Sequence, residues 1–197
     1  AVNYRCRVYL NGTLIGSHEG GFTPFQFNAT NVVKEGGNFL AVEVDNTRTA
    51  DAIPALSFDW WNYGGITRDV MLVHTPKNYI RDYFIQLDKY DSDRVHAEVQ
   101  LSAQNAGQLV KIEIPELKIA NKVFTDGTGL AKATFRVRNL ERWSPQAPKL
   151  YQVIVSSEVD EVKENIGFRN LYVKNTQIYL NDSPVFMKSI GLHVFHG

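Results

Sequence analysis

The sequence predicts an all-β protein built from antiparallel sandwiches. Apolar residues recur at every second position in most segments, which is the period of a strand with one buried and one solvated face. Clusters of Asn, Gly, Asp and Pro separate these segments at turn-like intervals. We find no stretch of helical length with apolar residues at three-and-four spacing.

A first block of strands opens the chain. Its first strand places one set of residues on the buried face (Val2, Tyr4, Cys6, Val8 and Leu10) and another on the wet face (Asn3, Arg5, Arg7 and Tyr9). The stretch "LNGT" (10–13) predicts an Asn-Gly hairpin turn that returns through Leu14 and Ile15. The strand pattern continues at Phe25 and Phe27, "KEGGN" (34–38) turns the chain, and further strands are predicted at 40–44 and at "TRDVMLVH" (67–74).

A second block runs from about 79 to 168. Alternation predicts strands through 83–87, 95–101, 110–114, 133–137 and 153–155, separated by polar turns. Strands of this number and spacing favour a small antiparallel sandwich of immunoglobulin-like size. A third, short block predicts a hairpin around "NDSP" (181–184) that leads into one more strand.

The chain ends suggest a piece of a longer protein. The first block offers about five strands, few for a sandwich that folds alone, and it opens within a strand at residue 2. A final strand near residue 190 cannot bury both of its faces without a neighbour. We therefore expect both ends to be cut from a longer protein.

Composition excludes several classes of function. Lys plus Arg and Asp plus Glu both total 21, so no net charge draws the chain to nucleic acid or to an acidic membrane. The apolar runs are too short to span a bilayer. Cys6 is the only cysteine, which rules out an intrachain disulfide, and His193 with His196 is a poor metal site without a third ligand. We expect no cofactor and no metal, and the compartment is left open, with the bacterial periplasm or cytoplasm favoured.

Four stretches resemble the N-terminal region of glycoside hydrolase family 2, the β-galactosidases and β-glucuronidases. They are "VYLNGTLIGSHEGGFTPFQFNAT" (8–30), "DWWNYGGITRDVMLVHTP" (59–76), "RWSPQAPKLY" (142–151) and "IGFRNLYVKNTQIYLNDSPVFMKSIGLH" (166–193). Their order and spacing match the family across essentially the whole chain. The resemblance implies a partial jelly-roll sugar-binding domain at 1–77, an immunoglobulin-like β-sandwich at 78–168, and at 169–197 an entry hairpin with the first strand of a truncated (β/α)8 catalytic barrel.

The family's catalytic groups are missing from these 197 residues. The resemblance implies retaining hydrolysis by two glutamates of the barrel, and that chemistry needs carboxylates about 5 Å apart. The acid/base glutamate would follow an asparagine, and the chain contains no Asn-Glu pair. Its own glutamates, such as Glu98, Glu113 and Glu161, fit solvated strand faces. We therefore expect no catalytic residue here and no activity from this chain alone.

Asp59 is the residue expected to touch substrate. In the resemblance, the acid that opens "DWWNYGG" lies on a jelly-roll loop that reaches the barrel mouth and binds the terminal sugar. A carboxylate accepts strong hydrogen bonds from sugar hydroxyls, and a neighbouring ring such as Trp60 stacks on the sugar's C–H face. The alternatives are that Asp59 caps a turn and that Trp60, Trp61 and Tyr63 pack in the core or between domains.

The remaining candidates shape the loop or line the barrel. Asn62 and Tyr63 are expected to hold the loop, and Gly64 and Gly65 to permit a bulge or a positive φ where it rejoins its strand. His193 aligns with a histidine that lines the family's sugar pocket. However, Leu192 and Val194 depart from the basic and acidic neighbours that the family usually has. The segment "LHVFHG" (192–197) is therefore open to being foreign to the family.

Two classes of function follow. The leading hypothesis is an accessory-domain piece of a retaining exo-β-glycosidase that hydrolyses terminal β-galactosides or β-glucuronides. Its partners would be the terminal sugar, the missing barrel and, as an open option, a second copy of the chain. The alternative is a non-enzymatic carbohydrate-binding or adhesion module, in which exposed tryptophans of "DWW" would bind sugar directly.

Overall fold

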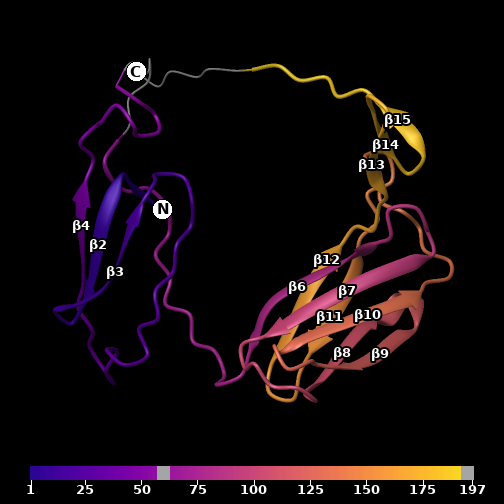
Figure 1. Cartoon of the computed structure of the whole chain (residues 1–197), viewed down its shortest axis with the longest axis horizontal. Coiled ribbons are helices and arrows are strands. Elements are labelled where there is room, and N and C mark those ends of the chain that lie inside the picture. Colours follow the sequence, from indigo (N-terminus) through magenta and orange to yellow (C-terminus); the bar gives the residue numbers. More distant parts are fainter. Residues whose placement is uncertain (57–62, 192–197) are drawn as a thin grey trace. The chain divides into compact units, whose positions relative to one another are not determined.

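The computed structural model describes residues 1–56 and 63–191 and divides the chain into two compact units, Ala1–Val73 and His74–Gly197 (Figure 1). In the described ranges every sheet is antiparallel, as the alternation predicts. The single helical turn within them is the 3₁₀ segment η1, Pro115–Leu117. No helix of the described chain is long and apolar enough to cross a membrane.

The first unit contains a three-stranded sheet in the order β3-β2-β4 and a two-stranded ladder of β1 with β5. The strands are β1 Val2–Asn3, β2 Arg5–Leu10, β3 Thr13–Glu19, β4 Leu40–Asp45 and β5 Gly65–Ile66. The predicted Asn-Gly hairpin joins β2 to β3. Asn11 and Gly12 have φ values of 52° and 82°, the two positive values that a type I′ turn requires.

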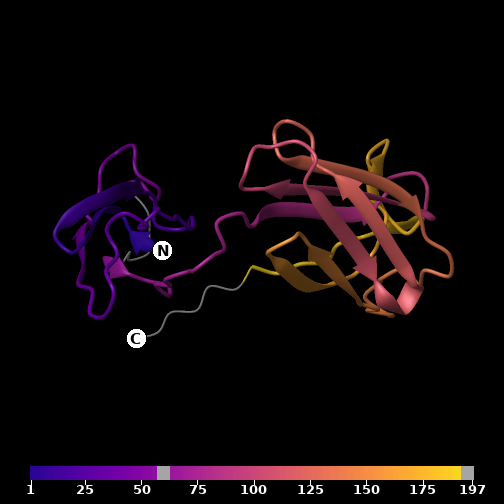
Figure 2. The same ribbon diagram turned by 90° about the horizontal axis from the view of Figure 1, so that it is seen from below.

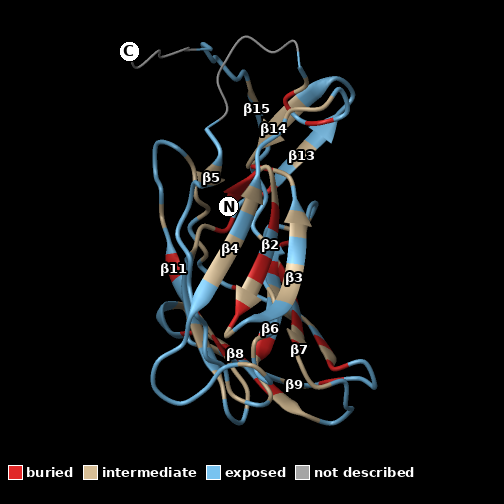
Figure 3. Cartoon of the chain, turned by 90° about the vertical axis from the view of Figure 1, so that its left-hand side faces the viewer, coloured by how far each residue is buried: buried red, intermediate tan, exposed pale blue. Residues whose placement is uncertain are grey.

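The core of the first unit lies on one face of β2. Cys6, Val8 and Leu10 are buried at alternate positions, as predicted, whereas β3 and β4 are mostly half-buried or exposed (Figure 3). Phe25 and Phe27 pack against this core from irregular chain, so the prediction of a strand there is wrong. A Cβ on Gly16 would lie 2.3 Å from the Phe27 ring, so a glycine is needed for the ring to approach β3 this closely.

The predicted strand at 67–74 is also wrong. Regular pairing ends at β5, and the last backbone bond to β1 runs from the Thr67 amide to the Ala1 carbonyl, at 3.0 Å. Beyond it, Val70, Met71 and Leu72 are 59%, 78% and 77% exposed. The apolar run is suited to a strand, but no described strand lies beside this segment to complete the hydrogen-bond ladder, and a strand forms only with such a neighbour.

The second unit is a seven-stranded sandwich followed by a small three-stranded sheet. One sandwich sheet has the order β10-β7-β6 and the other β12-β11-β8-β9 (Figures 1 and 2). The strands are β6 Ile80–Leu87, β7 Arg94–Leu101, β8 Leu109–Ile114, β9 Ile119–Phe124, β10 Leu130–Arg136, β11 Tyr151–Ser156 and β12 Glu161–Ile166. Seven antiparallel strands in two facing sheets match the size of an immunoglobulin constant domain.

The sandwich core combines the inward residues of both sheets. Val95 and Val99 of one sheet and Val110, Ile112 and Ile114 of the other are fully buried at alternate positions. The Tyr151 and Phe168 rings close one part of this core with centroids 6.1 Å apart. The alternation read from these strands therefore marks the core correctly.

Two strands of the sandwich, β9 and β12, were not predicted. Both are edge strands of the four-stranded sheet. Their burial patterns alternate only between half-buried and exposed or are mostly exposed, and the sequence "EVKENI" of β12 carries four polar residues. An edge strand takes much of its stability from the ladder with its neighbour, so its own residues need not alternate strongly.

The last described element is the sheet β13-β14-β15, formed by Leu171–Lys174, Gln177–Leu180 and Ser183–Val185. Asn181 and Asp182 turn the chain between β14 and β15 with φ values of 49° and 68°, where the hairpin turn was predicted. Residues 186–191 form no strand, and residues 192–197 lie outside the described range. The first strand of a barrel therefore stays a prediction.

Candidate functional site

The short ladder between β1 and β5 fixes the chain directly after residues 57–62. Val2 pairs with Ile66 and Asn3 with Gly65, and the Thr67 amide extends the ladder to Ala1. Residues about sixty positions apart in the sequence are thereby held side by side. This ladder is the C-terminal anchor of the loop in which the sequence places its sugar-binding candidates.

Asn3 strengthens this anchor from a buried position. Its side chain is 7% exposed, and its Nδ2 donates to the Tyr63 carbonyl oxygen at 3.0 Å. Its Oδ1 has no hydrogen-bond partner among the described residues. A Cβ on Gly21 would lie 2.6 Å from that oxygen, so Gly21 leaves the space in which the Asn3 amide fits.

Two glycines shape the chain where the loop rejoins the ladder. Gly65 has a φ of +109°, a conformation that side-chain-bearing residues rarely adopt. A Cβ on Gly64 would lie 2.4 Å from Nδ2 of Asn46, at the end of β4. Tyr63, directly before them, is 79% exposed. The Gly pair therefore combines an unusual turn with a close approach to a neighbouring side chain.

The chain that leads into the loop is tethered from the other side by Tyr4 and Arg5. The Tyr4 hydroxyl accepts a hydrogen bond from the Ile53 amide at 3.2 Å, and Arg5 Nη2 donates to Thr49 Oγ1 at 3.4 Å. Arg5 Nε also lies 3.2 Å from Glu19 Oε2. Both flanks of residues 57–62 are therefore held by residues 1–5.

The charges around Arg5 reinforce one another. Its hydrogen bond to Glu19, together with the nearby carboxylates of Asp45 and Asp51, raises the pKa of the Arg5 guanidinium. The Thr49 hydroxyl lowers the pKa of Asp51 by hydrogen bonding to its ionised form. Both shifts favour the charged forms of Arg5 and Asp51.

The sequence-predicted site residues fall on both sides of the described range. Asp59, Trp60, Trp61, Asn62 and His193 lie outside the described residues. Tyr63, Gly64 and Gly65 lie at the anchor described above. Nothing in the described chain adds a metal centre, since it holds no group of three or more His, Cys, Asp or Glu side chains suited to a metal ion.

The anchoring residues Asn3 and Arg5 were not found from the sequence. Alternation placed both on the wet face of one continuous strand. In the structure that strand breaks at Tyr4, because β1 pairs with β5 whereas β2 pairs with β3 and β4. The break puts Asn3 in the interior. The residue types around Asn3 do not indicate that the chain changes its pairing strand at Tyr4.

Comparison with known proteins assigns both units. Residues 1–76 match the sugar-binding domain of glycosyl hydrolases family 2, and residues 78–169 match the family's next domain, described as glycosyl hydrolases family 2. A putative β-glucuronidase of Formosa agariphila is 28% identical over 99% of this chain and 25% of its own length. A β-galactosidase of Clostridium acetobutylicum is 30% identical over 95% of this chain and 22% of its own length.

Solved structures agree with these matches. The crystal structure of a Ruminococcus gnavus β-glucuronidase superposes with a TM-score of 0.77 at 28% identity, covering 95% of this chain and 35% of that one. The chain thus spans a quarter or less of the two curated relatives and about a third of the solved one. The chain belongs to glycosyl hydrolase family 2 and comprises its sugar-binding domain and the immunoglobulin-like domain that follows.

Proposed function

We propose that this chain is the accessory region of a retaining exo-β-glycosidase that hydrolyses terminal β-galactosides or β-glucuronides. The observation that carries the proposal is the match of two consecutive family domains, in order, over nearly the whole chain. Relatives named β-glucuronidase and β-galactosidase align with 95–99% of the chain. The catalytic glutamates and the barrel would belong to the rest of the parent protein.

In this proposal Asp59 accepts hydrogen bonds from the hydroxyls of the terminal sugar. The anchors on both sides of residues 57–62 support that role. Asn3 bonds Tyr63 on one flank, and Tyr4 and Arg5 hold the other. A substrate group must be held in place by packed and hydrogen-bonded neighbours if it is to select among sugars. Trp60 and His193 are proposed as further contacts to the sugar.

The test uses the full-length parent enzyme with nitrophenyl β-galactoside and nitrophenyl β-glucuronide as substrates. We expect hydrolysis of one of them, and Asp59→Ala should lower kcat/KM for it by about ten- to hundredfold, the value of a hydrogen bond to a charged group. Glu35→Gln is the matched control, because Glu35 lies in an exposed turn of the same unit. The chain of residues 1–197 alone should hydrolyse neither substrate.

Two results would contradict the proposal. The first is a parent enzyme that hydrolyses neither glycoside, and the second is an Asp59→Ala enzyme that matches the Glu35→Gln control. Saturable quenching of tryptophan fluorescence by galactose or glucuronate in the isolated chain, lost in Asp59→Ala, would instead favour the carbohydrate-binding module.

A further inference from the structure

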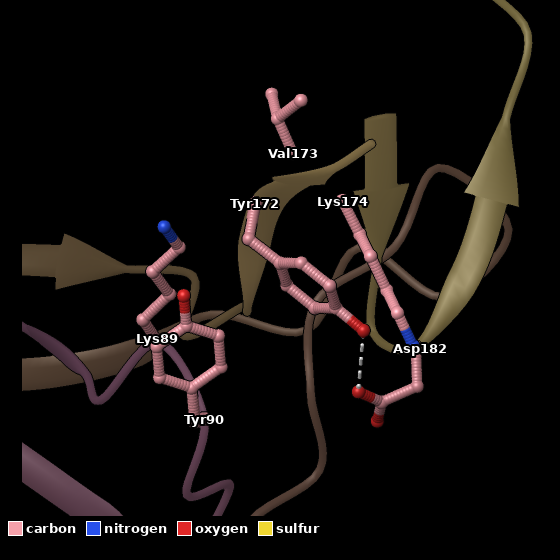
Figure 4. A pocket seen from close by; sticks show the side chains of 6 residues that line it. All are labelled: Lys89, Tyr90, Tyr172, Val173, Lys174 and Asp182. Atoms are coloured by element: carbon pink, nitrogen blue, oxygen red, sulfur yellow. Dashed lines mark hydrogen bonds between the residues drawn. The ribbon is translucent and has the colours of Figure 1, made fainter. Parts of the chain in front are cut away.

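A hollow of about 370 Å³ lies in the second unit, between the β6–β7 turn and the β13-β14-β15 sheet. Figure 4 shows Tyr90 of the turn and Tyr172 of β13 side by side in it, with Val173 directed away. Its volume falls in the range of small-molecule sites. The lining residues are Lys89, Tyr90, Tyr172, Val173, Lys174 and Asp182.

Two tyrosine rings line the hollow, and a third, Tyr179, stacks against one of them from outside the lining. Tyr172 and Tyr179 are opposite each other on β13 and β14, and their rings stack with centroids 5.3 Å apart at an angle of 3°. The Tyr90 ring lies 6.1 Å from that of Tyr172 at 55°, and Tyr90 is 79% exposed. Aromatic faces of this kind pack well against flat ligands with an apolar side, such as the C–H face of a pyranose.

Charged groups border the rings. Lys89 Nζ lies 5.1 Å from the centroid of the Tyr90 ring, and Lys174 lines the opposite side (Figure 4). Asp182 Oδ2 is paired with Arg142 Nη1 at 2.8 Å, and Asp182 Oδ1 accepts from the Tyr172 hydroxyl at 3.3 Å. The lining therefore contains two lysines and one aspartate, and the charge of that aspartate is already paired with Arg142. The remaining positive charge favours an anionic ligand.

Asp182 also favours a ligand that carries hydroxyl groups. Its side chain is 66% exposed, and a carboxylate has about four acceptor positions, of which two are in use here. The bond from Arg142 lowers the pKa of Asp182, which keeps the acceptor ionised. A purely aromatic acid would offer these acceptor positions no donor and leave them to water, whereas a sugar supplies hydroxyl donors.

The two sides of the hollow are held in place by Asn170. Its Nδ2 donates to the carbonyl of Asp88 in the turn, and its backbone carbonyl accepts from the Asn181 amide at 2.9 Å. The carboxylate of Asp88 accepts from the Tyr90 amide at 2.8 Å and so fixes the turn itself. A surface that is already ordered loses less entropy when it binds a ligand.

We propose that this hollow, the tyrosine hollow, is a second carbohydrate site that binds acidic oligosaccharides. One sugar ring packs on Tyr90. Lys89 and Lys174 bind the carboxylate of that sugar or of the next one, and Asp182 accepts hydrogen bonds from sugar hydroxyl groups. The hollow is lined only by residues of the second unit, and the proposal does not depend on the function proposed for Asp59.

The test is a calorimetric titration of the chain of residues 1–197 with tetragalacturonate and, in parallel, with the neutral cellotetraose. We expect saturable binding of tetragalacturonate with a Kd on the order of 1 mM at low salt, weaker at high salt because the lysines are exposed. Tyr90→Ala should weaken binding by about two- to tenfold, as expected for one aromatic contact. The double variant Lys89→Ala with Lys174→Ala should lose the preference for the acidic probe.

Phe84→Ala and Lys122→Ala are the matched controls. Phe84 is 56% exposed and Lys122 is exposed on β9, and neither lines the hollow. Both should bind like the unmodified chain, and all variants alter exposed side chains, so circular dichroism should stay unchanged. The proposal is overturned by absent binding, by equal binding of the neutral probe, or by a Tyr90→Ala loss no greater than that of Phe84→Ala.

Discussion

Asn170 connects the sandwich to the β13-β14-β15 sheet, and replacing it should loosen the whole second unit. It is 3% exposed, its Nδ2 donates to the Asp88 carbonyl, and its Oδ1 accepts from Arg142 Nη1 at 3.0 Å. Asn170→Ala removes both bonds and leaves the Asp88 carbonyl, which lies in a partly buried environment, and one guanidinium N–H without this partner. The variant should therefore cost more than an ordinary surface substitution.

The magnitude follows from the two bonds. A net hydrogen bond between neutral groups stabilises by about 1 kcal/mol, and one to a charged group by about 1.5–3 kcal/mol. The second value is reduced here because Arg142 keeps its bond to Asp182 at 2.8 Å and its side chain is 28% exposed to water. We therefore expect a loss of about 2–3 kcal/mol in the free energy of unfolding.

The assay is urea unfolding followed by the fluorescence of Trp143, in a background of Trp60→Phe and Trp61→Phe. Trp143 reports on this region because its carbonyl accepts from Asn181 Nδ2 at 2.9 Å. With a urea m-value of about 2 kcal/mol/M, the midpoint should fall by about 1 M. Asn165→Ala is the control, since Asn165 is exposed on β12. A shift no larger than the control's would refute the role assigned to Asn170.

Two further predictions concern one site in each unit. Gly65→Ala should destabilise the β1–β5 ladder by about 1–3 kcal/mol because of the φ of +109°. Hydrogen exchange of the Thr67 amide should accelerate accordingly, whereas Gly37→Ala, whose Cβ would meet nothing within 4 Å, should leave it unchanged. In the second unit, the hydrogen bond to Glu164 and burial raise the pKa of Tyr83 to about 12, so this interaction is intact below pH 10 and is lost as the pH rises toward 12. Ultraviolet titration should show a phenol with a pKa of about 12 that falls in Glu164→Gln, and an unchanged titration would contradict the assignment.

Local alternation predicted the strands that face a core. It failed where pairing with a neighbouring strand determines whether a strand forms. Val95, Val99 and Ile112 alternate because each side chain enters the space between two sheets, so the pattern is visible in the sequence. The edge strand β12 is stabilised by its ladder with β11, whatever its side chains are. Met71 shows the converse case: it belongs to an apolar run that has no described neighbour to pair with and stays exposed.

The candidate site shows the same difference between what a local pattern predicts and what long-range contacts determine. The expected positive φ in the glycine pair is present at Gly65, because an unusual backbone needs a glycine whatever else surrounds it. Asp59 itself lies outside the described residues. The anchors could not be predicted, since Asn3 and Arg5 contact residues 60 and 44 positions away, which the local pattern does not place beside them. The β1–β5 ladder and the Asn3 bond to the Tyr63 carbonyl hold the chain directly after residues 57–62. A substitution at Asn3 should therefore disturb Tyr63 and this ladder, and under the function proposed for Asp59 its effect on substrate selection by the parent enzyme should follow that of Gly65→Ala.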